Sequence, residues 1–299
     1  MSLISAGQLA ARTLDPDLRV VDVRWYLGRP GDGRIAYDAG HIPGAIFVDV
    51  DADLVAATGP GRHPLPDPTV FASRMGALGI GSEHRVVVYD DVGGWVAARL
   101  WWMLDDLGHR AVSVLDGGYQ AWTGGGHPVE VAGSAWPAAG LVLADRWTKV
   151  VDRDELRARL GKVIVLDARA APRYRGEVEP IDPIAGHIPT AQNAPTDGNL
   201  GVEGRFLSAG ELEARFRALG VSGPDGPDGS GGAGGANGVD GPPQVVNSCG
   251  SGVSACHNAL AMRIAGLPDP LLYPGSWSDW STAGYPVAVG PEPGEAPKA

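Results

Sequence analysis

The sequence has few cysteines, no excess of positive charge and no long hydrophobic run. Only two of its 299 residues are cysteines, Cys249 and Cys256, which is too few for a disulfide scaffold or a cysteine-based zinc site. Acidic residues outnumber basic ones by 35 to 24, so no basic surface is expected for nucleic acid. No segment is apolar enough to span a bilayer, and the N-terminus does not resemble a signal peptide. We therefore expect a cytoplasmic, reduced protein that binds neither nucleic acid nor membrane.

What the sequence does contain is one pattern in two copies. The segment Gly-His-Ile-Pro occurs at residues 40–43 and again at residues 186–189. An apolar run ending in Asp-x-Arg precedes each of them, at residues 20–24 and 165–169. A repeat at this distance is typical of two similar domains, since the period of a solenoid is much shorter.

Charged residues that recur in both copies are expected to support the fold. Arg24 and Arg169 follow the same strand-like run, which favours an ion pair with a carboxylate inside each domain. His41 and His187 also recur, so we expect them to bond the backbone rather than to catalyse.

Each copy alternates strand-like and helix-like segments. This alternation predicts an α/β fold in which two tandem domains each contain a parallel sheet with helices on both faces. In the first copy the expected strands are residues 19–23, 85–89 and 111–115, and the expected helices are 70–78 and 96–107. In the second copy they are strands 163–166, 244–247 and 270–273, and helices 209–218 and 255–265.

Composition sets the expected domain boundaries. We predict an N-terminal domain over residues 1–130, a linker over 131–146 and a C-terminal domain over 147–290. Residues 222–243 are mostly Gly, Pro, Asp, Ser and Ala, and they read as a disordered insertion in the second domain. Residues 291–299 read as a disordered tail.

Cys249 lies where a predicted strand ends and a predicted helix begins, inside a loop of small residues. Backbone N–H groups of such a loop, together with the positive end of the helix dipole, favour a thiolate, which is the nucleophilic form. The alternative is a buried structural cysteine, but a core cysteine needs no donor-rich loop. A nucleophile must be reachable, so we expect Cys249 to be open to solvent. The loop residues that could donate to its sulfur are Gly250, Ser251, Gly252, Val253 and Ser254.

Three chemistries compete for this loop. A dinucleotide fingerprint, G-x-G-x-x-A, needs an acidic residue after the next strand, whereas Asp269 lies before it. A cysteine phosphatase needs an arginine six residues after the cysteine to clamp phosphate, and Ala255 stands there. The third chemistry is sulfur transfer.

The Cys249 loop, the two Gly-His-Ile-Pro segments and the two Gly- and Trp-containing endings, at residues 116–122 and 273–280, together resemble the tandem-domain rhodanese family. The resemblance implies two α/β domains around five-stranded parallel sheets, with the active cysteine only in the second. Alignment of the copies places Asp90 where the first domain would carry that cysteine. The implied enzyme is a sulfurtransferase that moves sulfur from a small anionic donor, through a Cys249 persulfide, to cyanide or a thiol. The alternative is a catalytically silent scaffold or sulfur-carrier-binding protein with the same fold.

The resemblance also implies roles for particular residues. Arg173 matches the arginine that binds the donor's anionic end. Ser251, with His63 and Asp51, matches a trio proposed in enzymes of the mercaptopyruvate type to pass a proton to the leaving enolate. Gly250, Gly252, Val253 and Ser254 complete the substrate-binding loop.

The choice of donor stays open between 3-mercaptopyruvate and thiosulfate. The residues after Cys249 are neutral, which favours 3-mercaptopyruvate. However, residues 177–182 lack the second arginine of mercaptopyruvate enzymes, which would leave the carboxylate on Arg173 alone. No metal or organic cofactor is implied, and the acceptor could be a small redox protein.

Overall fold

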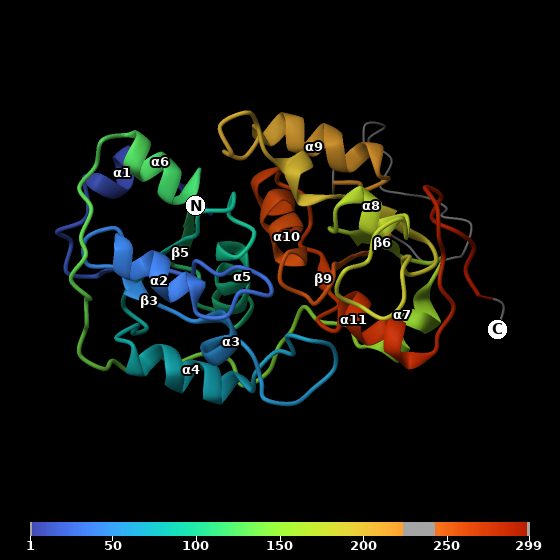
Figure 1. Ribbon diagram of the computed structural model, residues 1–299, viewed down its shortest axis with the longest axis horizontal. Helices are drawn as coiled ribbons and strands as arrows, with labels where there is room; N and C mark the ends of the chain where they lie inside the picture. The colour runs from blue at the N-terminus through green and yellow to red at the C-terminus, as the bar shows by residue number, and fades with distance from the viewer. Residues whose placement is uncertain (1, 224–242, 298–299) are drawn as a thin grey trace. The chain divides into compact units, whose positions relative to one another are not determined.

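The computed structural model describes residues 2–223 and 243–297, which form two compact units (Figure 1). The N-terminal unit comprises the chain up to Gly59, then Leu65–Thr148 and Leu200–Phe206. The C-terminal unit comprises Pro60–Pro64, Lys149–Asn199 and the chain from Leu207 onward. Each unit therefore includes one short segment from the other half of the sequence: Pro60–Pro64 belongs to the C-terminal unit and Leu200–Phe206 to the N-terminal unit. The sequence repeat alone did not indicate this.

The sequence-based domain boundaries stay a prediction. Of the predicted insertion, residues 224–242 lie outside the described residues, as do residues 298–299 of the predicted tail.

The N-terminal unit is built on a five-stranded, all-parallel sheet with the order β1-β5-β4-β2-β3. Its central strands consist largely of β-branched residues that are buried on both faces, as parallel sheets require. The strands are β1 Leu3–Ile4, β2 Leu18–Asp22, β3 Ile46–Phe47, β4 Arg85–Tyr89 and β5 Val112–Leu115.

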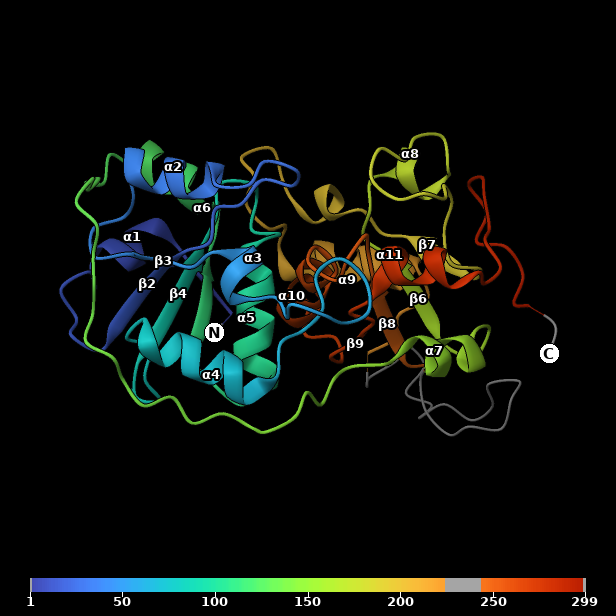
Figure 2. The ribbon, with the colours of Figure 1, turned by 60° about the horizontal axis from the view of Figure 1, so that its bottom comes forward.

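Helices cover both faces of this sheet, with α2 and α6 on one side and α4 and α5 on the other (Figure 2). One core joins Tyr37 of α2 and Trp122 of α6 to Val20 and Val87 of the sheet. The helices are α1 Ala6–Ala10, α2 Asp32–Ala39, α3 Val50–Asp53, α4 Pro68–Ala77, α5 Ala97–Asp106 and α6 Gly118–Gly124.

The C-terminal unit has a shorter parallel sheet with the order β7-β6-β8-β9. Its strands are β6 Ile164–Asp167, β7 Ala191–Asn193, β8 Val245–Ser248 and β9 Leu271–Leu272. The resemblance implied five strands in this sheet, whereas the described part of the unit has four. A single parallel bridge between Val150 and Leu272 occupies the place that the paired strand β1 takes beside β5 in the N-terminal unit.

The helices of this unit also pack on both sides of their sheet. One core joins Leu156 of α7, Tyr174 of α8 and Trp277 of α11 to Val165 and Val246 of the sheet. The helices are α7 Arg153–Arg159, α8 Ala171–Tyr174, α9 Ala209–Ala218, α10 Ala255–Ile264 and α11 Ser276–Trp280, with two 3-10 turns, η1 Thr196–Asn199 and η2 Ser281–Ala283. No helix among the described residues of either unit has the length and apolar character needed to cross a membrane.

The predicted ion pair is present in both units. Asp22 and Arg24 are 2.7 Å apart between Oδ2 and Nη2, and Asp167 and Arg169 are 2.6 Å apart between the same atoms. In each unit the arginine also donates to the carbonyl of the glycine before the repeated histidine, at Gly40 and Gly186.

The repeated histidines have the structural role that was expected. His41 bonds the carbonyls of Tyr37 and Ala132, and His187 bonds those of Tyr174 and Glu292. Each ring also stacks on its tyrosine, with centroids 3.8 Å apart.

Candidate active site

Cys249 directly follows β8, at the carboxyl end of a central strand of the C-terminal sheet. The chain runs from it through residues 249–254, here called the Cys249 loop, into α10. Ligands of parallel α/β sheets bind at this edge, where loops from neighbouring strands meet. The local structure is therefore the one that the sequence predicts.

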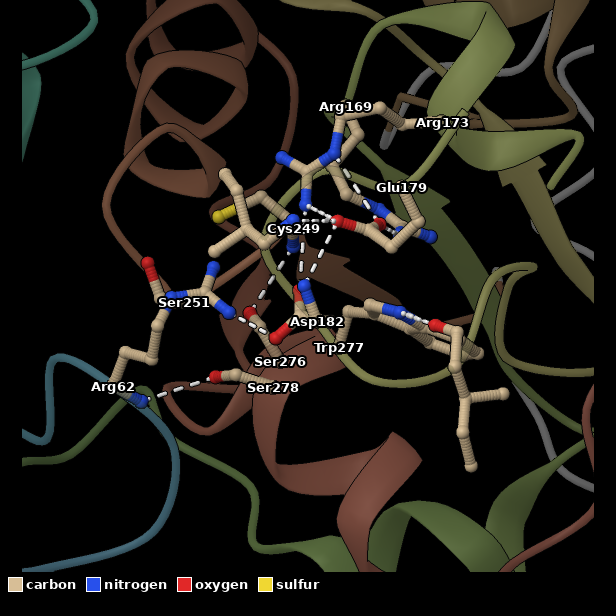
Figure 3. A network of polar contacts seen from close by, with 12 residues as sticks. Arg62, Arg169, Arg173, Glu179, Asp182, Cys249, Ser251, Ser276, Trp277 and Ser278 are labelled. Carbon is tan, nitrogen blue, oxygen red and sulfur yellow. Dashed lines mark hydrogen bonds and ion pairs between the residues drawn. The ribbon is translucent and has the colours of Figure 1, made fainter. Parts of the chain in front are cut away.

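Hydrogen bonds to α11 fix the path of the loop. The N–H of Trp277 donates to the carbonyl of Cys249 at 3.0 Å, and the N–H of Ser278 donates to that of Gly250 at 2.9 Å. The N–H of Cys249 donates to Oγ of Ser276 at 3.1 Å (Figure 3). These bonds turn the loop carbonyls toward α11, which leaves loop N–H groups available to the sulfur.

Gly252 supplies such a donor. Its N–H lies 3.1 Å from Sγ of Cys249, which is the expected contact between a loop amide and the sulfur. The residue has a φ of 77°, and a Cβ added there would collide with the carbonyl oxygen of Pro274. Only glycine fits this position without strain.

Cys249 is 1% exposed, so the expectation that it is open to solvent is wrong for this conformation. The sulfur is turned into its own loop, toward Gly252, and Val253 and Ser251 beside it are also buried. Access of a donor to the sulfur therefore requires side chains of the site to move.

Ser251 and His63 are brought together, as expected. Oγ of Ser251 lies 2.6 Å from Nδ1 of His63, and both side chains are buried. His63 lies in Pro60–Pro64, the short segment of the first half of the chain that packs in the C-terminal unit. Gly61 is packed closely there, since a Cβ on it would lie 2.5 Å from the carbonyl oxygen of Gly275.

Asp51 lies in α3 of the N-terminal unit, where its carboxylate accepts a hydrogen bond from Nε1 of Trp25 at 2.9 Å. Its pairing with His63 stays a prediction. Ser254 is the first residue before α10 and makes no side-chain capping bond to it. The contact of Ser254 with substrate stays a prediction.

Arg173, on the short helix α8, points its guanidinium at the Cys249 loop. A Cβ placed on Gly250 would lie 3.6 Å from its Nη1. Nη2 donates to Glu179 at 2.7 Å and to Asp182 at 3.3 Å (Figure 3). Burial raises the pKa of Glu179, but the hydrogen bond from Arg173 and two backbone N–H groups outweigh it and hold that pKa below its usual value.

Arg62 is a site residue that the sequence reasoning missed. Its Nη1 bonds Oδ1 of Asp182, the same carboxylate that Arg173 contacts through Oδ2 (Figure 3). Its Nη2 would lie 3.0 Å from a Cβ on Gly250. Burial raises the pKa of Asp182, although Arg62 and Arg173 act against this rise. The only signal in the sequence was that Arg62 precedes the predicted site residue His63.

Arg169 completes the charged surroundings of the loop. Its guanidinium is 4.8 Å from the ring centroid of Trp277, and it bonds Asp167 and Glu179. Burial lowers its pKa, but attraction to Asp167 and then to Glu179 and Cys249 raises it above its usual value. Within residues 2–223 and 243–297 no cluster of three or more His, Cys, Asp or Glu side chains could hold a metal ion.

The fold and the loop are those of a rhodanese-like domain occurring twice. The rhodanese-like domain family matches residues 5–124 and 152–283 of this chain. The chain belongs to the rhodanese family, as a member with two tandem domains.

Relatives of nearly full length place it among the sulfurtransferases. The chain is 45% identical to a probable 3-mercaptopyruvate sulfurtransferase of Pseudomonas aeruginosa, with 96% of this chain and 98% of that protein covered. It is 36% identical to human 3-mercaptopyruvate sulfurtransferase, with 96% and 94% covered. It is 39% identical to a putative thiosulfate sulfurtransferase of Mycobacterium tuberculosis, with 94% of each covered.

A solved structure agrees with these relatives. The 3-mercaptopyruvate sulfurtransferase from Leishmania major superposes with a TM-score of 0.79 at 31% identity, covering 95% of this chain and 75% of that one.

Proposed function

We propose that the protein transfers sulfur from 3-mercaptopyruvate to a thiol or to cyanide, with Cys249 as the nucleophile. The single observation that carries this proposal is the Cys249 loop. It holds a cysteine at the carboxyl end of a central strand, with a backbone N–H on its sulfur and a hydrogen-bonded Ser251–His63 pair beside it. Membership of the sulfurtransferase family agrees with the same chemistry.

In the first half-reaction the thiolate of Cys249 attacks the thiol sulfur of the donor. A sulfur–sulfur bond forms, the carbon–sulfur bond of the donor breaks, and its electron pair leaves as the enolate of pyruvate. Cys249 then carries the persulfide. The enolate takes up one proton, which the hydroxyl of Ser251 delivers and His63 replaces.

In the second half-reaction the outer sulfur leaves. Cyanide, or the thiolate of an acceptor, attacks it, the sulfur–sulfur bond breaks, and its electron pair returns to Cys249 as thiolate. The loop N–H groups stabilise the anionic sulfur in both halves of the cycle, and the N–H of Gly252 is already placed for this.

The proton-donating pair favours 3-mercaptopyruvate over thiosulfate. A departing enolate needs a proton on carbon, whereas sulfite leaves as a stable anion and does not. The 2.6 Å bond between Ser251 and His63 therefore suits the first donor specifically. A small redox protein with a reactive thiol would be a suitable acceptor, and a reducing cytoplasm would keep such thiols available.

The test compares kcat/KM for 3-mercaptopyruvate and thiosulfate, each with cyanide as acceptor. We expect a clear preference for 3-mercaptopyruvate, and loss of turnover with both donors when Cys249 is replaced by serine. Equal or better use of thiosulfate would overturn the donor assignment. Turnover that survives C249S would overturn the nucleophile.

A further inference from the structure

We propose that Arg62 is the second guanidinium of the donor site, and that Asp182 occupies the position of the donor's carboxylate until the donor binds. This inference rests on the proposed function and names a residue that sets its substrate specificity. The bound donor would exchange with Asp182 between Arg62 and Arg173.

Arg62 and Arg173 share one carboxylate, that of Asp182. Arg62 bonds one oxygen of Asp182 and Arg173 bonds the other, at 3.3 Å for the second contact. In Figure 3 the carboxylate of Asp182 lies between the two guanidiniums, with a dashed line to each. The pair of arginines therefore already has the spacing that one carboxylate can bridge, and carboxylates are the ligands that guanidinium groups bind best.

The two guanidiniums lie close to the nucleophile. Both guanidiniums lie over Gly250, the residue next to the nucleophile, at 3.0 Å for Arg62 and 3.6 Å for Arg173 from a Cβ placed there. The carboxylate of 3-mercaptopyruvate is only two carbons from the carbon that carries its sulfur. A donor whose sulfur meets Cys249 must therefore place its carboxylate within the reach of both groups.

The backbone around Arg62 is anchored to other residues of the site. Its backbone N–H donates to Oγ of Ser278 at 3.0 Å, and the next residue, His63, bonds Ser251. Its Nε is buried, and among the described residues this atom has no hydrogen-bond partner. An arginine anchored between two site residues, with one N–H donor unused, can donate to a further acceptor atom without a rearrangement of the segment.

Charge explains why an exchange is needed. The guanidiniums of Arg62, Arg169 and Arg173 are matched by the carboxylates of Asp167, Glu179 and Asp182 in the same network. The carboxylate of a bound donor can pair with a guanidinium only if one of these three carboxylates moves away. Asp182 is the one that bridges two arginines, and burial already disfavours its charged form.

The test measures KM and kcat for two sulfur donors, one with a carboxylate and one without. The donors are 3-mercaptopyruvate and mercaptoacetone, in which a methyl group replaces the carboxylate. We expect R62Q to raise KM for 3-mercaptopyruvate about 10- to 100-fold, as for loss of one charge-assisted hydrogen bond, with kcat little changed. KM for mercaptoacetone should be unchanged.

D182N separates a competitor from a supporting residue. If Asp182 competes with the donor, D182N lowers KM for 3-mercaptopyruvate and leaves mercaptoacetone unaffected. If Asp182 only orients the two arginines, D182N raises KM, and the exchange is refuted. R62K keeps the positive charge but loses the planar pair of N–H donors of the guanidinium. Its KM for 3-mercaptopyruvate should lie between those of the wild type and R62Q. R175Q is the matched control, because Arg175 is paired with Glu177 away from this network.

Failure of this inference is distinguishable from failure of the proposed function. Binding of 3-mercaptopyruvate to C249S, measured by calorimetry with and without R62Q, needs no turnover. Equal affinity in both variants would overturn the role of Arg62. Absence of a persulfide on the wild-type protein would instead overturn the function. Thermal melting confirms that each variant is folded, and R62K serves if R62Q is not.

Discussion

The two units place different groups at the same point of the same loop. In the N-terminal unit β4 ends at Tyr89 and the loop of residues 90–96, here called the Asp90 loop, begins with Asp90. In the C-terminal unit β8 ends at Ser248 and the Cys249 loop begins with Cys249. The hydrogen bond to the helix after the next strand is also shared, since Tyr119 of α6 donates its N–H to the carbonyl of Asp90 as Trp277 of α11 does to that of Cys249.

In the Asp90 loop, backbone N–H groups surround the carboxylate of Asp90 itself. Oδ1 of Asp90 accepts the N–H groups of Val92 and Gly94 at 3.0 and 2.8 Å. Oδ2 accepts those of Val96 and Ala97, both at 2.9 Å. The carboxylate is fully buried and cannot act as a sulfur nucleophile. In both units the loop directs backbone N–H groups at its first side chain, and the identity of that side chain, a carboxylate or a thiol, decides between structure and chemistry.

Replacement of the nucleophile should have the largest effect. C249S and C249D are both expected to reduce kcat/KM by about a thousandfold or more, because neither side chain can form a persulfide. C249D should remain folded, since the Asp90 loop holds the same carboxylate. C256S, which keeps a donor toward the carbonyl of Gly252, is the control and should retain turnover. Activity in C249D would break the comparison.

Removal of the Asp90 carboxylate should have the next largest effect, and this effect should be on stability. D90A leaves four buried N–H donors without acceptors, so we expect the free energy of unfolding to fall by about 2–4 kcal/mol. C249A should cost about 1 kcal/mol, since the contact between the N–H of Gly252 and the sulfur is lost. Urea unfolding followed by tryptophan fluorescence measures both. Equal losses would show that the two loops are not specialised in this way.

The Ser251–His63 pair should affect turnover with 3-mercaptopyruvate but not with thiosulfate. S251A removes the hydroxyl that faces His63, and we expect kcat for 3-mercaptopyruvate to fall about a hundredfold. With thiosulfate, whose leaving group needs no proton, the effect should be under threefold. Steady-state kinetics with both donors gives the ratio. A similar loss with thiosulfate would assign Ser251 to sulfur binding instead.

The smallest effect concerns pH. Burial raises the pKa of Asp90 above its usual value, although four backbone N–H groups lower it. The folded state therefore binds more protons than the unfolded state between the two pKa values, so this contribution to stability falls as pH rises from about 3.8. The wild type should lose stability relative to D90N over this window, by at most about 1.4 kcal/mol per pH unit. Parallel unfolding curves at several pH values test this, and a constant difference would contradict it.

The sequence predicted most of the fold because its signals were local. The strands 85–89 and 244–247 and the helices 209–218 and 255–265 agree with β4, β8, α9 and α10 to within one or two residues. The missing fifth strand of the C-terminal unit could not be predicted, because a single bridge at Val150 leaves no periodic pattern.

The site was predictable where a motif carried it and not where tertiary contacts did. The strand–Cys–Gly-rich loop–helix order was sufficient to locate Cys249 and the donor at Gly252. Arg62 was missed because its partner Asp182 is distant in the chain, and no local pattern joins them. The burial of Cys249 was missed because exposure depends on side chains packed around the loop.

Mass spectrometry of the protein after treatment with 3-mercaptopyruvate tests the central claim most directly. The peptide containing Cys249 should gain about 32 Da, the mass of one sulfur atom, and lose it again when cyanide is added. No gain on any peptide, or a gain confined to Cys256, would contradict it.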